Sequence, residues 1–315
     1  MSKIAFIYPG QGAQKAGMGA DFYENSEIAR YIFDQAGEEL DLDMKELCFE
    51  ENDRLDLTEY TQAAMVTTCL AMTRVAESKG LKADITAGLS LGEYPAIAAA
   101  GGMNDMDAIR LVRKRGILMQ NTVPAGEGAM CAVISMAAEE IEKVIEPIAD
   151  VSVANYNCPG QIVITGKTDA VEEAAAKLKE AGARRTIMLN VSGPFHSQML
   201  VPAGEKLAEE LEHTRFHELR IPYVTNVTAE KVTDIRETPG LLTTQISSPV
   251  CWMQSMERMI ADGVDTFVEI GPGKTLEGFL RKIDRSVKVF HISQWEDVDK
   301  VCEELADSGK MMEEA

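Results

Sequence analysis

The sequence predicts an α/β fold built on a mostly parallel sheet, with a smaller α+β subdomain inserted in the middle of the chain. Near both ends, short apolar runs alternate with longer segments of helical periodicity, which is the pattern of parallel strands joined by helices. The middle of the chain has the order β-α-β-β-α-β instead, which is typical of a ferredoxin-like subdomain. A chain of 315 residues is long enough for one large domain with an insertion of this size.

The N-terminal third predicts the first two strands of the large domain. Residues 4–8 form an apolar run that ends in Pro9 and Gly10, which indicates a buried strand followed by a glycine-rich loop. Residues 58–79 predict one long helix, because apolar side chains recur at helical spacing, and Thr58 is placed to cap it. Further elements are expected as a strand at 85–88 and helices at 91–100 and 105–120.

The inserted subdomain is predicted between two turn-rich segments that are candidate hinges. Residues 124–126 read Pro-Ala-Gly, and residues 193–194 read Gly-Pro. We therefore assign residues 126–195 to the small subdomain, and residues 1–125 and 196–315 to the large domain. Within the subdomain, strands are expected at 129–136, 151–154, 161–165 and 186–189, and helices at 138–148 and 168–181.

The alternation of strands and helices resumes after the insertion and completes the large domain. Residues 266–270 form a buried strand that leads into a Gly-Pro-Gly turn, which indicates a tight connection to a following helix. The other elements expected here are helices at 199–213, 239–246 and 252–262 and strands at 221–224 and 289–292.

The charge of the chain excludes one class of protein. The formal net charge is -20 at neutral pH, whereas a nucleic-acid-binding protein normally has a basic surface. The N-terminus lacks the pattern of a signal peptide, and no run of about 18 apolar residues indicates a membrane span. None of the six cysteines forms a CxxC pair, so we expect reduced thiols in a cytoplasmic protein that binds neither nucleic acid nor membrane.

Three motifs match a ligand-binding pattern only in part. Residues 273–275 read Gly-Lys-Thr like the end of a phosphate-binding loop, but the first glycine of that loop is missing. Residues 10–12 begin like a dinucleotide-binding motif, but Lys15 stands where its third glycine belongs. His213 and His217 are spaced for a shared metal, yet no third ligand accompanies them. No metal or redox cofactor is therefore expected.

Residues 88–92 read Gly-Leu-Ser-Leu-Gly and match the G-x-S-x-G motif of a nucleophile elbow. The motif lies between a predicted strand and a predicted helix, where a sharp turn lifts the serine hydroxyl above the sheet. The helix N-terminus also directs free N–H groups and the positive end of its dipole at a developing oxyanion. Ser90 is therefore the candidate nucleophile.

A serine nucleophile needs a general base, and the chain has four histidines from which to choose it. His196 follows a predicted strand in a turn that reads Ser-Gly-Pro-Phe-His-Ser, and functional side chains favour loops of this kind. His291 lies on the last predicted strand and is expected to be buried, whereas His213 and His217 are expected at a solvated helix end. His196 is therefore the candidate base.

The elbow and six further segments resemble the malonyl-CoA:acyl-carrier-protein transacylases, a family of serine acyltransferases. Residues 88–94 are similar to the family's G-H-S-L-G-E-Y elbow, and residues 6–12 are similar to its F-x-F-P-G-Q-G opening. The other similar segments are 115–120 (R-G-x-x-M-Q), 155–161 (N-x-N-x-P-x-Q), 193–196 (which contains the family's catalytic histidine), 245–250 (Q-x-x-x-P-V) and 269–273 (E-x-G-P-G). The likeness extends nearly from end to end. It implies a hydrolase-like domain, with helices on both faces of the sheet, and a ferredoxin-like insertion.

The resemblance also implies the chemistry of the site. Ser90 would be the nucleophile and His196 the base. The backbone N–H groups of Gln11 and Leu91 would form the oxyanion hole. The implied reaction is ping-pong transfer of malonyl from malonyl-CoA, through an ester on Ser90, to the phosphopantetheine thiol of acyl carrier protein in fatty-acid synthesis. It needs no cofactor, and a stand-alone member of the family is expected to be a monomer.

Three residues of the family's site would bind the substrate or support the base. Arg115 would pair with the malonyl carboxylate, although its neighbours Arg113 and Lys114 by themselves favour a solvated helix face. Gln245 would help to position the histidine and line the site, and Phe195 would restrict the choice of acyl group. One position departs from the family: the histidine that usually precedes the serine is Leu89 here, which removes a hydrogen-bonding group from the pocket.

Other functions remain open on the sequence alone. A serine hydrolase such as a thioesterase shares the elbow but has no use for Arg115. A catalytically idle domain that docks carrier proteins does not need Ser90 and His196. A trans-acting acyltransferase of a polyketide pathway would use the same site as an enzyme of fatty-acid synthesis. The carrier protein itself is expected on a basic cluster, for which a solvated helix face is the alternative reading. The cluster consists of Lys274, Arg281, Lys282 and Arg285.

Overall fold

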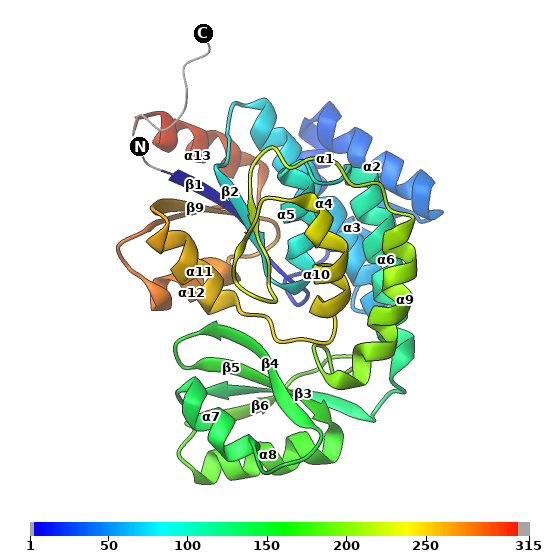
Figure 1. The fold of residues 1–315 in the computed structure, drawn as a ribbon. Helices are drawn as coiled ribbons and strands as arrows, with labels where there is room; N and C mark the ends of the chain where they lie inside the picture. The colour runs from blue at the N-terminus through cyan, green and yellow to red at the C-terminus, as the bar shows by residue number, and fades with distance from the viewer. Residues whose placement is uncertain (1–2, 308–315) are drawn as a thin grey trace.

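The structure, a computed structural model, describes residues 3–307 and consists of a large α/β part and a smaller part formed by the middle of the chain (Figure 1). The strands of the large part are β1 (Lys3–Tyr8), β2 (Ile85–Gly88), β7 (Tyr223–Val224), β8 (Lys231–Val232), β9 (Val264–Ile270) and β10 (Lys288–Ile292). They form a six-stranded sheet with the order β10-β9-β1-β2-β7-β8. Neighbours are parallel except for the antiparallel pair β7 and β8 at one edge, which confirms the predicted mostly parallel sheet.

The side chains of β1 explain why helices cover both faces of this sheet. Successive side chains of a strand point to opposite faces. Ile4, Phe6 and Tyr8 belong to the core cluster on one face, whereas Ala5 and Ile7 belong to the cluster on the other face. A strand that is buried on both faces has a continuous apolar sequence, which is why residues 4–8 predict it correctly.

Two groups of helices supply the partners of these faces. On one side, α4 (Thr58–Ser78) packs against α2 (Glu27–Leu40), α5 (Glu93–Ala99) and α6 (Asp105–Thr122). On the other side, apolar residues of α11 (Trp252–Ala261) and α12 (Thr275–Ile283) complete the second cluster. The remaining helices are α1 (Ala20–Asn25), α3 (Met44–Phe49), α9 (Val201–Glu212), α10 (Thr238–Gln245) and α13 (Trp295–Asp307), with 3₁₀ turns η1 (Ser90–Gly92), η2 (Gln198–Leu200) and η3 (Ile235–Glu237).

Helices α1, α2, α3 and α13 and strand β8 are not among the elements that the sequence analysis predicts. In α2, Ala29, Ile32, Phe33 and Ala36 are buried and follow helical spacing, so the signal is present in the sequence. In contrast, β8 contains 2 residues, and a strand this short carries no periodicity from which to predict it.

The smaller part is a four-stranded antiparallel sheet with the order β4-β5-β3-β6. Its strands are β3 (Gly128–Ile134), β4 (Val151–Cys158), β5 (Gln161–Lys167) and β6 (Arg185–Met188). Helices α7 (Ala138–Ile145) and α8 (Thr168–Glu180) bury their apolar residues against it. This element order and strand order confirm the ferredoxin-like prediction. The domain boundaries at 126 and 195 stay a prediction.

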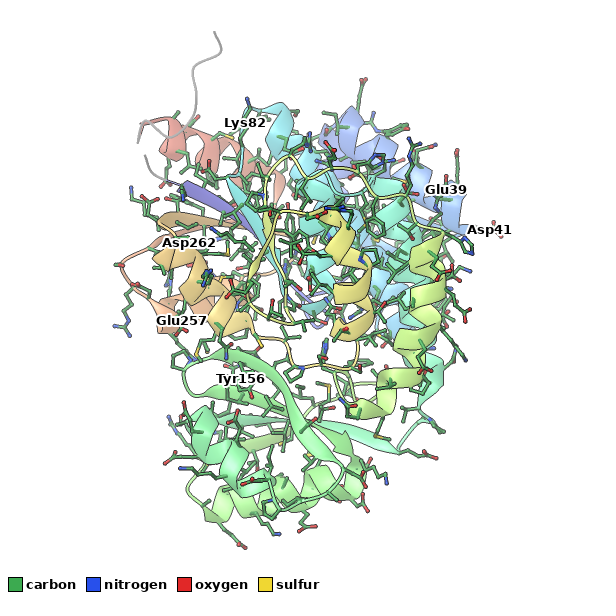
Figure 2. The ribbon with its side chains drawn as sticks, viewed as in Figure 1. Glu39, Asp41, Lys82, Tyr156, Glu257 and Asp262 are labelled. Carbon is green, nitrogen blue, oxygen red and sulfur yellow. The ribbon has the colours of Figure 1, made fainter. Side chains whose placement is uncertain are left out.

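Backbone hydrogen bonds join the two parts at β4. The N–H of Val250 donates to the carbonyl oxygen of Ala154 at 2.8 Å, and the N–H of Tyr156 donates to the carbonyl oxygen of Val250 at 2.9 Å. Figure 2 labels Tyr156 on this strand, at the junction with the large part. A loop of the large part therefore pairs with β4 as a short extra strand and fixes how the two parts meet.

Within residues 3–307, no helix combines the length and apolar character needed to cross a membrane. The same part of the chain contains no group of three or more His, Cys, Asp or Glu side chains placed to hold a metal ion.

The elbow between β2 and α5 depends on two glycines that allow the backbone to approach itself. A Cβ atom on Gly88 would lie 1.8 Å from the carbonyl oxygen of Gly92. A Cβ atom on Gly92 would lie 2.2 Å from the carbonyl oxygen of Tyr8 on the neighbouring strand. Both gaps are far below a van der Waals contact, so any larger residue forces the backbone to move.

We expect Gly92→Ala to lower the free energy of unfolding by more than about 2 kcal/mol, because the clash is with backbone atoms that cannot rotate away. Gly240→Ala in α10 is the matched control, since no heavy atom lies within 4 Å of a Cβ atom there. That control should change the stability by less than about 1 kcal/mol. Urea unfolding measures both variants. Equal unfolding midpoints for Gly92→Ala and the wild type would show that the elbow tolerates a side chain.

Candidate active site

Ser90 lies at the turn between β2 and α5, where the G-x-S-x-G motif predicts it. Its φ of 52° is in the left-handed region, which strains any residue other than glycine. The Ser90 Oγ atom lies 2.7 Å from Nε2 of His196. His196 comes from the loop between β6 and η2, and its φ of 61° is also left-handed. The fold thus brings the candidate nucleophile and the candidate base within hydrogen-bonding distance.

His196 is oriented by a backbone carbonyl group. Its Nδ1 atom lies 2.9 Å from the carbonyl oxygen of Gln245. A carbonyl oxygen can only accept, so Nδ1 carries the proton and Nε2 presents its lone pair to Ser90. Burial, and then the positive charge of Arg115, lowers the pKa of His196 to about 4. The imidazole is therefore neutral near pH 7, which is the state that a general base needs.

Asn226, which follows β7, holds the elbow in its strained shape. Its Oδ1 atom accepts from the N–H of Ser90 at 2.7 Å, and its Nδ2 atom donates to the carbonyl oxygen of Gly88 at 2.7 Å. One buried carboxamide thus bridges the residues on both sides of position 89. Two hydrogen bonds to the backbone stabilise a conformation that the chain would otherwise leave.

Arg115 points into the protein and reaches the candidate nucleophile. On the same helix, Arg113 pairs with Glu59 at 2.8 Å and Lys114 pairs with Glu210 at 3.5 Å. Arg115 is 1% exposed, and its Nη2 atom lies 3.4 Å from Ser90 Oγ. Burial lowers the pKa of Arg115, but a guanidinium group remains charged in proteins. A positive charge therefore lies directly beside the serine hydroxyl.

Gln245 contacts the other members of the site. Its Oε1 atom accepts from Arg115 Nη2 at 3.1 Å. Its Nε2 atom donates to Glu93 Oε2 at 2.7 Å and to the carbonyl oxygen of Ser90 at 3.0 Å. A second amide, Gln62 of α4, accepts from Arg115 Nη1 at 2.9 Å. The guanidinium group is thus fixed by neutral acceptors and has no direct hydrogen bond to a carboxylate in the described part of the chain.

A cavity of about 560 Å³ opens beside Ser90 and His196, between the large and small parts. Phe195 lies on its wall and is 7% exposed. Leu89, at the position where the family usually has histidine, adds another apolar side chain to the wall. The other apolar lining residues include Met130, Val163, Leu189, Val191, Leu276 and Phe279. Polar residues such as Gln11, Asn155 and Asn157 line the rest, so the cavity offers both apolar and polar contacts to a short acyl chain beside the serine.

The two residues predicted for the oxyanion hole come from different segments of the chain. Gln11 lines the cavity that Ser90 also lines, whereas Leu91 directly follows the serine and its side chain is buried. Gln11 Nε2 donates to the Thr58 hydroxyl at 3.0 Å, and that hydroxyl lies 2.6 Å from Ser192 Oγ. The prediction that Thr58 caps α4 is therefore wrong, because its side chain makes no capping bond and ties the Gln11 loop to the segment before His196.

Three residues of this network have no role in the predictions from the sequence. Asn226 and Gln62 are single amides in segments without a motif, so no sequence signal distinguishes them from other polar residues. Glu93 lies within the family elbow but carries no known pattern of its own. His291 is less buried than expected, since 37% of its side chain is exposed next to Glu277.

Known proteins match this chain over nearly its whole length. The family model for the Acyl transferase domain matches residues 5–298. A Malonyl CoA-acyl carrier protein transacylase of Bacillus subtilis is 43% identical over 312 residues, which is 98% of each chain. The crystal structure of the malonyl CoA-acyl carrier protein transacylase of Clostridium perfringens has a TM-score of 0.94 and 42% identity, and the match covers 98% of each chain.

A third likeness involves a complex. A malonyl-transacylase whose structure contains a type II PKS acyl-carrier protein has a TM-score of 0.93 and 35% identity. The match covers 96% of this chain and 100% of that one. Sequence and fold therefore agree along nearly the whole length, and this chain belongs to the acyl transferase domain family, with malonyl CoA-acyl carrier protein transacylases as its relatives.

Proposed function

We propose that this protein transfers a malonyl group from malonyl-CoA to the phosphopantetheine thiol of acyl carrier protein, through an ester on Ser90. The observation that carries the proposal is the place of Arg115, whose Nη2 atom lies 3.4 Å from Ser90 Oγ next to the Ser90–His196 pair. A cation at this place serves an acyl group that ends in a carboxylate. The names of the relatives, which are malonyl CoA-acyl carrier protein transacylases, support the same substrates.

The first half-reaction uses His196 as base and then as acid. Nε2 of His196 takes the proton of the Ser90 hydroxyl while Oγ attacks the thioester carbonyl. The backbone N–H groups of Gln11 and Leu91 receive the negative charge that develops on the carbonyl oxygen. The carbon–sulfur bond then breaks, and the proton passes from His196 to the sulfur of CoA. The malonyl ester of Ser90 remains.

The second half-reaction runs the same steps with the carrier protein. The phosphopantetheine thiol gives its proton to His196, and its sulfur attacks the ester carbonyl. The bond to Ser90 Oγ breaks, and the proton returns to the serine. No step needs a cofactor. A thiol acceptor is favoured over water because the relatives are named transacylases. Fatty-acid synthesis and a polyketide pathway would both use this reaction, and one relative is solved with a type II PKS carrier protein.

Arg115 and Phe195 are the residues that we propose for acyl selection. A guanidinium group can hold both oxygens of a carboxylate, and a buried cation gains most from such a partner. Phe195 lies on the cavity wall beside His196, where a bulky ring opposes an α-methyl group. Gln245 would keep both the arginine and the histidine in place.

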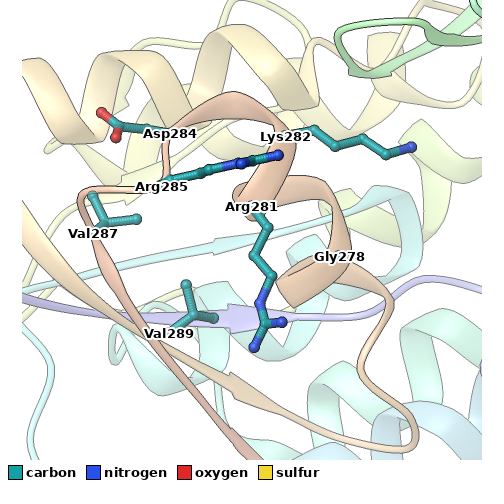
Figure 3. Close-up of a pocket in the computed structure, with 7 residues that line it drawn as sticks. All are labelled: Gly278, Arg281, Lys282, Asp284, Arg285, Val287 and Val289. Carbon is teal, nitrogen blue, oxygen red and sulfur yellow. The ribbon is translucent and has the colours of Figure 1, made fainter.

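The carrier protein is proposed to dock on the basic cluster at the end of α12. Figure 3 shows Arg281, Lys282 and Arg285 around a surface cavity. The same helix begins with Thr275 and Leu276, which line the cavity beside Ser90, so a protein bound here has a short path to the serine. Carrier proteins are acidic, and a local basic surface offsets the net charge of -20 on this chain. We also propose a cytoplasmic location, in keeping with six free cysteines, of which four are buried. A monomer is proposed because the family resemblance implies it.

Mixing with malonyl-CoA is expected to add one malonyl group to the wild-type protein, seen by intact mass spectrometry, and none to Ser90→Ala. His196→Ala should slow this acylation by about 10²–10⁴, the usual loss for a general base. His291→Ala is the control, because this side chain pairs with Glu277 away from the site. If Ser90→Ala is labelled at the wild-type level, or if His291→Ala loses the rate instead, the assignment of the reacting pair is wrong.

Arg115→Ala is expected to lose transfer of malonyl while transfer of acetyl is unchanged or rises. In the wild type, malonyl gives Arg115 a direct carboxylate partner and acetyl does not, so malonyl should be strongly preferred. The kcat/KM values for malonyl-CoA and acetyl-CoA measure this preference. Arg113→Ala, which removes a cation from the same helix, should keep it. A malonyl preference that survives in Arg115→Ala would place the carboxylate elsewhere.

Charge reversal at Arg281 and Lys282 together is expected to raise KM for the carrier protein by about tenfold or more, with KM for malonyl-CoA unchanged. The matched control reverses Lys177 and Lys179 on α8, which changes the net charge equally at the far end of the small part (Figure 1). Steady-state transfer assays give both constants. Equal effects of the two double variants would reject this docking surface.

A further inference from the structure

A buried carboxylate and a buried guanidinium group share one amide in this site. Glu93 is 0% exposed and Arg115 is 1% exposed. The Gln245 carboxamide connects them, since it donates to Glu93 Oε2 at 2.7 Å and accepts from Arg115 Nη2 at 3.1 Å. The amide dipole is aligned with both charges, with its N–H end at the anion and its oxygen at the cation. The arrangement is an ion pair with a neutral group in the middle.

Among charged side chains, Arg115 has the largest effect on Glu93. Arg115 faces it from α6, Tyr94 follows it on its own helix, and Tyr223 faces it from β7. Burial raises the pKa of both tyrosines, so they stay neutral. His196, on the far side of Gln245, is neutral as well. Arg115 is therefore the charge that balances Glu93 when no substrate is present.

One oxygen of Glu93 is left for a proton. Oε2 accepts from Gln245 and from the backbone N–H of Asn226 at 3.2 Å. Oε1 is buried without a hydrogen-bond partner in residues 3–307, and the same holds for the hydroxyl of Thr225 close to it. The Thr225 hydroxyl can donate to Oε1 while Glu93 is ionised and can accept from it once Oε1 carries a proton, so the surroundings accommodate both states of the carboxyl group. Burial also raises the pKa of Glu93 to about 7, so the proton is available at ordinary pH.

We propose that Glu93 is the resident counter-charge of Arg115 and takes up a proton when the carboxylate of a malonyl group pairs with that arginine. The inference rests on the proposed function, because it needs a carboxylate beside Arg115. Once that carboxylate pairs with Arg115, one cation faces two anions, and both Arg115 and Glu93 are buried. Repulsion between two buried anions is costly, and protonation of Glu93 removes it. Glu93 thus acts as a positioning and charge-balancing residue that does not touch the substrate.

The affinity for the malonyl group should fall as pH rises through the pKa of Glu93. Below the pKa of Glu93 the proton is already present, and the malonyl group enters a site with one net positive charge. Above it, binding must take a proton from the solvent, and affinity falls as pH rises. His196 is neutral across this range because its pKa is lowered to about 4. The pH effect should therefore appear in substrate binding and not in the rate of acylation at saturation.

Single-turnover acylation by malonyl-pantetheine separates the half-saturating substrate concentration from the rate at saturation. This thioester is chosen because it has no phosphate group that titrates. From about pH 7 to pH 8.5 we expect the half-saturating concentration for the wild type to rise by up to about tenfold per pH unit. With acetyl-pantetheine it should not change. Glu93→Gln keeps the shape of the side chain and cannot ionise, so its half-saturating concentration for malonyl should stay low and constant within about twofold.

Glu269→Gln is the matched control. Glu269 is also fully buried with a pKa raised by burial to about 7, but it accepts from the backbone N–H groups of Leu276 and Glu277 and does not contact the arginine network. This variant should keep the wild-type pH slope whatever its stability. A slope that persists in Glu93→Gln, or that disappears in Glu269→Gln alone, would overturn the proposal.

A second measurement covers the case in which Glu93→Gln does not fold. Ser90→Ala should bind malonyl-pantetheine without reacting, and calorimetry in two buffers of different ionisation enthalpy counts the protons taken up at about pH 7.5. We expect uptake of a large part of one proton with malonyl-pantetheine and none with acetyl-pantetheine. Binding of malonyl without proton uptake would overturn the proposal. A wild type that forms no malonyl ester at any pH would instead reject the proposed function itself.

Discussion

The site depends on a single residue, Gln245, that joins groups from three other parts of the chain: the elbow, α6 and the loop with His196. Its backbone carbonyl orients His196, and its side chain links the guanidinium group of Arg115 to the carboxylate of Glu93 and to the backbone of Ser90. All of these groups are buried or nearly so, and a buried polar group that loses its partner costs about 1–3 kcal/mol or more. A network of this kind is either complete or unfavourable, which explains why the residues around the serine are held so closely.

The cavity beside the serine is a joint product of the two parts of the molecule. Ser90 and Leu276 belong to the large part, whereas Met130 and Asn155 belong to strands of the four-stranded sheet. The backbone bridge between Val250 and β4 fixes the distance between these walls. The insertion therefore forms one wall of the cavity, and the turn after β2 in the large sheet carries Ser90, the proposed nucleophile.

The sequence predicts β1, β2 and β9 well because these strands are buried on both faces, and their apolar runs are short and continuous. The two-residue edge strand β8 has no such run and escapes prediction. The sequence also predicts the positions of Ser90 and His196, since both lie in turns with a local motif. Arg115 is different: its basic neighbours predict a solvent-exposed helix face, and only the family resemblance predicts that its side chain lies in the site. Asn226 and Glu93 escape prediction entirely, because their importance comes from contacts made in space with segments more than a hundred residues away. The apolar residues of α2 follow helical spacing and could have predicted that helix, but nothing in its sequence relates it to the site.

The two residues proposed to react, Ser90 and His196, both have a left-handed backbone conformation. Each such conformation costs a non-glycine residue about 1–3 kcal/mol, and glycine would relieve it. Glycine, however, is the one residue that would also delete the hydroxyl or the imidazole. The backbone strain at these two positions therefore cannot be removed by substitution without loss of the side chain. A more heat-resistant form of this fold must gain its stability elsewhere, for example in surface charges and loops.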